Sequence, residues 1–175
     1  KNAAGEVLFK DRNILFKVTK GTINGKKADI EGKCSVFGDV KVEARTMGQK
    51  IPDMIKVINS SPELAEVQKV TLPFRQPDGI GDLYLTIYGK AQDDVTQIKF
   101  NEDLFAKGKV VFHNATTVLQ DTYLPVKNIN GEVNFDKRDA DYDIKGMLKD
   151  SHIHVKGTAQ NTNIDLTASS DRFKL

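Results

Sequence analysis

Two short runs decide the fold: His152-Ile153-His154-Val155-Lys156 and, after a polar link, Asn163-Ile164-Asp165-Leu166-Thr167. In both runs every second residue is apolar. Because the side chains of a β-strand alternate between the two faces of a sheet, each run places apolar groups on one face and polar groups on the other. The alternation therefore predicts strands with one apolar face.

The same alternation recurs along most of the chain, as in Glu6-Val7-Leu8-Phe9, 83–88 and 142–148. Turn residues such as Asn24-Gly25 and Lys149-Asp150-Ser151 separate the runs. Connections this short cannot hold a crossover between parallel strands. The sequence therefore predicts a mainly β fold built of antiparallel β-meander units.

One region departs from this pattern. Between 52 and 68 the apolar residues recur at helical spacing, which predicts one or two short helices within 52–69. The stretch 73–81, which contains Pro77-Asp78-Gly79, is expected to be a loop. We thus expect an N-terminal β-meander over 1–50, a helical insert over 51–70 and a second β-meander over 80–175. The β pattern continues to both ends of the chain, which suggests a single fragment of a longer repeating protein.

The two ends of the chain also resemble each other. Gly5-Glu6-Val7-Leu8-Phe9 matches Gly131-Glu132-Val133-Asn134-Phe135, and two later pairs of segments match at nearly the same offsets, 28–33 with 152–158 and 39–44 with 163–168. Such self-similarity predicts a stacked or repeating β architecture. Chance matching of short β patterns is the alternative.

Composition and charge exclude several classes of function. The 26 Lys and Arg residues against 24 Asp and Glu leave a net charge of +2, too small a surplus to indicate a nucleic-acid partner. Cys34 is the only cysteine, so the chain can form no internal disulfide and lacks the spaced thiols of a zinc site. No run approaches the roughly 20 apolar residues that a membrane-spanning helix needs.

A search for chemically active motifs predicts no enzyme, no metal site and no cofactor. His152 and His154 share one strand face, but no third ligand accompanies them, so we expect surface histidines. Gly79-Ile80-Gly81 leads into a strand rather than a helix, unlike a nucleotide-binding loop. Asp139, Asp141 and Asp143 alternate along a strand without the spacing of a Ca²⁺ loop, so we expect solvated carboxylates there.

From a short helical segment near Pro62 and then over about 72 to 157, the order and spacing of the motifs resemble those of the AsmA family, in particular its YhdP-like members. The matching segments are Pro62-Glu63-Leu64, Gly81-Asp82-Leu83-Tyr84-Leu85-Thr86-Ile87, Gly108-Lys109-Val110-Val111-Phe112, Leu124-Pro125-Val126, Asn130-Gly131-Glu132-Val133-Asn134-Phe135 and 152–157. The segment after Val95 is more charged than the family pattern, and no membrane anchor is present.

The resemblance implies a curved and twisted antiparallel sheet of repeated β-meander units that forms an open groove. In that family the groove carries phospholipid acyl chains between the inner and outer membranes and so supports outer-membrane lipid homeostasis. The resemblance also implies a periplasmic, envelope location, a full-length protein anchored in the inner membrane, and partners that include adjacent repeats of the same chain. The residues expected to face the lipid are Val7, Phe9, Phe16, Val18, Ile30, Val40, Val42, Leu83, Leu85, Ile87, Ile98, Phe100, Val110, Phe112, Val133, Phe135, Ile144, Ile153, Val155, Ile164 and Leu166.

The pattern of these residues allows a second interpretation. The same apolar face would form an ordinary core if the sheet closed as a sandwich or a barrel. The protein would then be a structural or adhesive β-repeat module that binds protein partners along its strand edges. A glycan or lipopolysaccharide carrier is a third possibility, for which the sequence shows no concentrated set of basic and aromatic residues.

Overall fold

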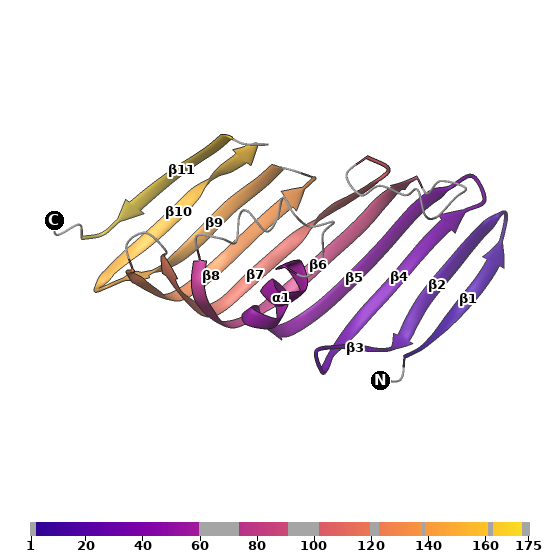
Figure 1. Ribbon diagram of the computed structural model, residues 1–175, viewed down its shortest axis with the longest axis horizontal. Coiled ribbons are helices and arrows are strands. Elements are labelled where there is room, and N and C mark those ends of the chain that lie inside the picture. Colours follow the sequence, from indigo (N-terminus) through magenta and orange to yellow (C-terminus); the bar gives the residue numbers. More distant parts are fainter. Residues whose placement is uncertain are drawn as a thin grey trace.

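The computed structural model of the chain describes residues 3–59, 74–90, 102–119, 123–137, 139–160 and 163–172. Their strands form one antiparallel sheet that lies in a single layer (Figure 1). The strands are β1 (Ala4–Lys10), β2 (Asn13–Lys20), β3 (Thr22–Ile23), β4 (Lys26–Ser35), β5 (Asp39–Lys50), β6 (Phe74–Lys90), β7 (Leu104–Leu119), β8 (Pro125–Asp136), β9 (Asp139–Leu148), β10 (Ser151–Gln160) and β11 (Asn163–Ser170). A single helix in these residues, α1 (Ile51–Asn59), follows β5.

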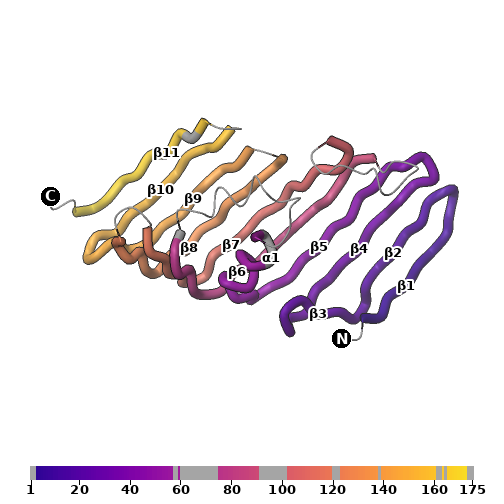
Figure 2. The backbone as a smooth tube through the Cα atoms, in the orientation of Figure 1, coloured from indigo at the N-terminus to yellow at the C-terminus, as the bar shows by residue number. Residues whose placement is uncertain are grey.

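The sheet is open, with β1 at one edge and β11 at the other. Sequence neighbours are neighbours in the sheet, apart from the two-residue β3, which pairs only with β4 (Figure 2). The predicted antiparallel, mainly β, open architecture is therefore confirmed. Its physical basis is local: tight turns such as those at Asn24-Gly25 and at Lys149 take up the positive φ angles that a hairpin needs.

The loop predicted over 73–81 is wrong, because β6 already begins at Phe74 and includes Gly79-Ile80-Gly81. The long partner strand β7 provides a ladder that overrides the turn chemistry of Pro77 and Gly79. The pairing of β6 with β7 accommodates these residues through two register shifts, one between Arg75 and Asp78 and one between Asp78 and Ile80. Of the one or two helices predicted within 52–69, α1 lies within the predicted helical insert over 51–70, and a second helix after Asn59 would lie outside the described residues.

The internal repeat has a structural counterpart. The strands β1, β2, β4 and β5 form one four-stranded meander, and β8 to β11 form another, with β6 and β7 between them. Equivalent residues take equivalent places in two cross-strand rows, Val7-Phe16-Gly32-Val42 and Val133-Tyr142-Gly157-Leu166. The rows Gly5-Val18-Ile30-Ala44 and Gly131-Ile144-Val155-Ala168 match in the same way. The two meanders therefore share their register as well as their sequence pattern.

A small core forms where α1 packs against the sheet. Its buried residues are Ile51, Ala115, Val126 and Ile129, and Ile55 of the helix packs against them. In Figure 1 the helix lies in front of the sheet, near the ends of β5 and β6. This core lies at one end of the strands and leaves most of the sheet outside it.

Candidate functional site

The register of the strands separates an apolar face from a polar face. Residues that pair across an antiparallel ladder point to the same side of the sheet. Val42 pairs with Gly32 on β4 and with Ile87 on β6, which places these residues on one face. Their chain neighbours Glu43 and Thr86 pair with each other and point to the other face. We call the face of Val42 the apolar face and the face of Glu43 the polar face.

The structure brings the predicted groove residues together on the apolar face. By register, that face carries Val7, Phe9, Phe16, Val18, Ile30, Val40, Val42, Leu83, Leu85, Ile87, Val110, Phe112, Val133, Phe135, Ile144, Ile153, Val155, Ile164 and Leu166. Ile98 and Phe100 lie outside the described residues. The sequence analysis missed further members of this face, among them Ile14, Cys34 and Tyr142. The alternation of Ile14 with Phe16 and of Tyr142 with Ile144 was the signal that would have identified two of them.

Within the described residues the apolar face lies largely uncovered. The buried apolar residues are Ala28, Ile51, Ala106, Ala115, Val126, Ile129 and Ala159, and none of them belongs to the predicted groove set. The groove residues with described side chains are instead half-buried or exposed, and Phe9 reaches 74% exposure. A sheet face of this kind normally packs on a second layer. Here the described residues provide only α1 as such a layer.

On this face, two glycines lie opposite aromatic residues of the neighbouring strands. Gly32 lies beneath the ring of Phe16, and a Cβ atom at Gly108 would stand 2.9 Å from Cζ of Phe135. Rings therefore occupy the space that side chains on the glycine strands would need. At these two positions the ring covers a backbone from which no side chain projects.

Two polar residues interrupt the apolar face beside α1. Gln49 is 2% exposed, and its Nε2 donates hydrogen bonds to the carbonyl oxygen of Ile23 at 2.9 Å and to Oγ1 of Thr46 at 2.6 Å. Thr46 in turn donates to the carbonyl oxygen of Lys27 at 3.1 Å. These bonds tie the β3 segment to β5, so that β3 forms a border of the apolar face. Farther along this face, burial raises the pKa of Tyr142.

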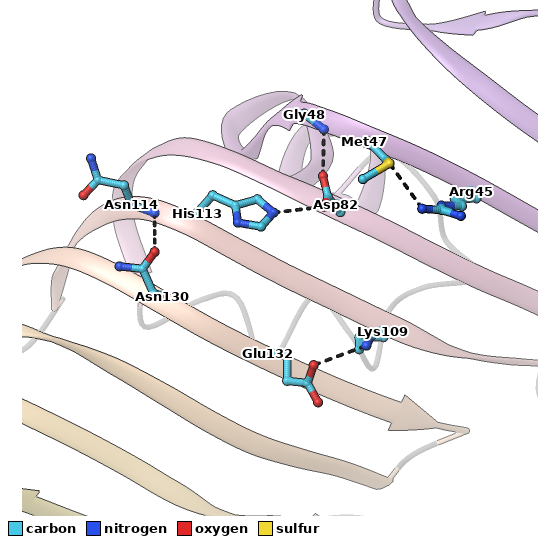
Figure 3. A network of polar contacts seen from close by, with 9 residues as sticks. All are labelled: Arg45, Met47, Gly48, Asp82, Lys109, His113, Asn114, Asn130 and Glu132. Carbon is cyan, nitrogen blue, oxygen red and sulfur yellow. Dashed lines mark hydrogen bonds and ion pairs between the residues drawn. The ribbon is translucent and has the colours of Figure 1, made fainter.

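The polar face carries cross-strand ion pairs. Lys109 lies 3.3 Å from Glu132 on the neighbouring strand (Figure 3), and Asp143 pairs with Lys156 at 3.0 Å. The hydrogen bond of His154 and then that of Lys156 hold the pKa of Asp143 below its usual value. Alternating charges of this kind keep a sheet face solvated and discourage stacking against another sheet.

The two histidines take the surface positions that the sequence predicts. His152 and His154 both lie on the polar face, and each forms a hydrogen bond with a carboxylate, Asp171 at 3.0 Å and Asp143 at 2.6 Å. Asp139, Asp141 and Asp143 are all exposed, as expected for solvated positions. No group of three or more His, Cys, Asp or Glu side chains in the described parts of the chain is arranged to hold a metal ion.

Asp82 forms the most buried polar contact on the polar face (Figure 3). Its carboxylate accepts a hydrogen bond from the backbone N–H of Gly48 at 2.8 Å and forms one with Nε2 of His113 at 2.9 Å. Burial alone would raise the pKa of Asp82, but these two bonds and the positive charges of His113 and Arg45 outweigh it and lower that pKa. Gly48 has a φ of +63° in the bulge of β5, so Asp82 stabilises the point from which the chain enters α1.

Comparison with protein-family models, curated proteins and solved structures gives no significant match for this chain. Among the described residues, no helix has the length and apolar character needed to span a bilayer.

Proposed function

We propose that the chain carries phospholipid acyl chains along its apolar face, as a segment of a longer periplasmic protein that links the inner and outer membranes. The observation that carries the proposal is the uncovered apolar face, on which Leu83, Leu85 and Val110 remain partly exposed in a single-layer sheet. An uncovered apolar surface of this extent is unfavourable in water unless an apolar ligand lies on it.

The dimensions and energetics of the face suit an acyl chain. Its apolar rows run across the strands from β1 to β11, and strands about 4.8 Å apart make such a lane roughly 40 Å long. One leaflet of a bilayer core is about 15 Å deep, so the lane exceeds the length of one acyl chain. Each CH₂ group removed from water contributes about 0.8 kcal/mol, so a sixteen-carbon chain gains on the order of 10 kcal/mol before entropic losses.

The run of apolar residues across neighbouring strands supports transport rather than storage. A deep pocket with fixed polar contacts would retain one lipid, whereas a surface of aliphatic residues and covered glycines offers similar binding at successive positions. Rows such as Leu83-Val110-Val133 continue over neighbouring strands without a charged side chain. Phospholipid head groups would remain in solvent beside this lane, and adjacent repeats of the longer chain would extend it beyond the edge strands.

A structural or adhesive module is the second candidate, and the free edge of β1 favours it. All seven residues of β1 are exposed, so its outer backbone groups are available for strand addition. That candidate also requires a closed interior filled with side chains, whereas the sheet in the described residues is open.

The proposal is tested by extracting the purified chain with organic solvent and identifying bound phospholipid by mass spectrometry. We expect bound lipid in the native protein and its loss in Ile87→Asp, which places a charge on the apolar face. The matched control is Thr86→Asp on the polar face of the same strand, which should retain lipid. Circular dichroism verifies that both variants fold. A lipid-free native protein, or equal lipid in both folded variants, would contradict the proposal.

A further inference from the structure

The strands β1 and β8 take equivalent places in the two meanders, but they differ in their outer neighbours. Gly5-Glu6-Val7-Leu8-Phe9 of β1 and Gly131-Glu132-Val133-Asn134-Phe135 of β8 have the same register with the strand that follows each of them. On its other side β8 pairs with β7, whereas within the described ranges β1 pairs only with β2. The pairing of β7 with β8 therefore provides a template for a strand at the open edge of β1.

The residues of β1 are more exposed than their counterparts on β8. Val7 is 61% exposed and Phe9 is 74% exposed, whereas Val133 and Phe135 are half-buried. The inner neighbours pair in the same way in both places, so the clearest difference between them is the outer strand β7. A strand beside β1 would remove apolar surface of Val7 and Phe9 from water and pair the outer backbone groups of β1.

The apolar face of β7 defines which residues such a strand needs. β7 places Gly108, Val110 and Phe112 opposite the phenylalanine, the valine and the glycine of β8. The ring of Phe135 covers Gly108, where a Cβ atom would stand 2.9 Å from Cζ of the ring. A ring in this position shields a strand backbone that has no side chain of its own. An incoming strand should therefore place a glycine opposite Phe9.

The polar face adds a requirement for charge. Glu132 of β8 forms an ion pair with Lys109 of β7 at 3.3 Å (Figure 3). Its counterpart Glu6 makes no ion pair within the described residues, although Lys17 lies opposite it on β2. A lysine that directly follows the glycine of an incoming strand would reach Glu6 as Lys109 reaches Glu132.

We propose that the edge of β1 binds an antiparallel polypeptide strand with the pattern Gly-Lys-Val-x-Phe, whose glycine lies opposite Phe9. A second copy of the chain is a poorer occupant. Its own β1 has the right spacing of glycine, valine and phenylalanine, but it would bring Glu6 to the place of Lys109 and so set two carboxylates side by side. Its other free edge, β11, contains no glycine. The proposal does not rest on acyl-chain transport.

The test measures binding of the native chain to a fluorescent peptide with the sequence of residues 104–114, by fluorescence anisotropy. We expect binding that weakens about tenfold when the peptide carries Gly108→Val, because the new side chain overpacks against the ring of Phe9. The same substitution raises the β-propensity of the peptide, so propensity alone predicts the opposite change. With the Phe9→Ala chain, the preference for glycine should disappear.

A charge reversal tests the polar face. The peptide variant Lys109→Glu should bind the native chain about threefold more weakly, and the chain variant Glu6→Lys should restore its binding. Two matched controls should leave binding unchanged: Val111→Thr in the peptide, and Phe37→Ala in the chain, which removes another exposed ring at 69%. Circular dichroism verifies that the chain variants fold.

Three results would overturn the proposal: no binding of the peptide, equal affinity for the Gly108→Val peptide, and a preference for glycine that persists in Phe9→Ala. Self-association of the native chain that Phe9→Ala abolishes, measured by analytical ultracentrifugation, would also overturn it and would assign the edge of β1 to a second copy. Phospholipid bound to the native chain is measured separately by mass spectrometry, so the proposed transport function can fail while strand binding holds.

Discussion

The ring of Phe16 on β2 occupies the space directly over Gly32 on β4, where Cζ and Cε1 of the ring leave no room for a Cβ atom. The two residues face each other across the ladder on the apolar face. Phe135 and Gly108 repeat the relationship between β8 and β7. In both places the ring covers a strand backbone that has no side chain of its own.

We expect Gly32→Ala to destabilise the protein by about 1–3 kcal/mol, because the new methyl group overpacks against Phe16. In a Phe16→Ala background the same substitution should cost much less, since the obstructing ring is absent. Urea unfolding of the two single variants and the double variant measures this coupling as a double-mutant cycle. Additive effects would show that the ring and the glycine do not interact.

Two isoleucines should differ in what they contribute to stability. Ile51 of α1 is 5% exposed within the core cluster, so Ile51→Ala should cost about 2–5 kcal/mol. Ile87 lies half-buried on the apolar face, so Ile87→Ala should cost less than about 2 kcal/mol in lipid-free protein. Chemical denaturation after delipidation measures both values. Equal losses would mean that Ile87 is packed as deeply as Ile51.

Acid should weaken the junction between β5 and α1. Because the folded-state pKa of Asp82 is lowered, its ionised carboxylate stabilises the fold above the ordinary carboxyl pKa of 3.8. This contribution is lost as the pH falls through the lower, folded-state pKa. The Asp82→Asn variant should therefore lose less unfolding free energy in acid than the native protein does. Urea titrations of both proteins at neutral and acidic pH measure this difference. An unchanged acid dependence in the variant would refute the assignment.

Removal of the Gln49 side-chain amide should loosen β3 while changing the global stability little. Gln49→Leu removes the hydrogen bond to Ile23, but it also removes Oε1, a buried acceptor without a partner in the described residues. The two effects oppose each other, so we expect a change within about 1 kcal/mol. Hydrogen exchange at the N–H of Ala28, which donates to Gly21, should nevertheless become faster. Unchanged exchange there would show that Gln49 does not hold β3.

The alternation of residues such as Ile153 and Val155 with His152 and His154 was sufficient to predict the strands and their two faces. That prediction succeeds because side-chain alternation follows from the geometry of each strand alone. The repeat was predictable for a related reason: runs with the same alternation pair with their apolar residues on the same face, as Val7-Phe16-Gly32 and Val133-Tyr142-Gly157 do.

Other features depend on partners distant in sequence and were not predictable. Phe74 begins a strand because β7 provides a ladder long enough to absorb Pro77 in a bulge. Gln49 reads as an ordinary polar residue at the end of a strand, yet contacts with β3 bury it on the apolar face. The carboxylate partners of His152 and His154 likewise depend on pairing between strands.

The sequence by itself determined the strands, their antiparallel order and the apolar character of one face, because these follow from local alternation and short turns. Only the tertiary structure decided that the described sheet stays open in one layer and that α1 covers just the region around Ile51. An apolar strand face has the same pattern whether it meets a second sheet, a helix or a lipid. The layer that covers it is determined by long-range packing, which alternation does not encode.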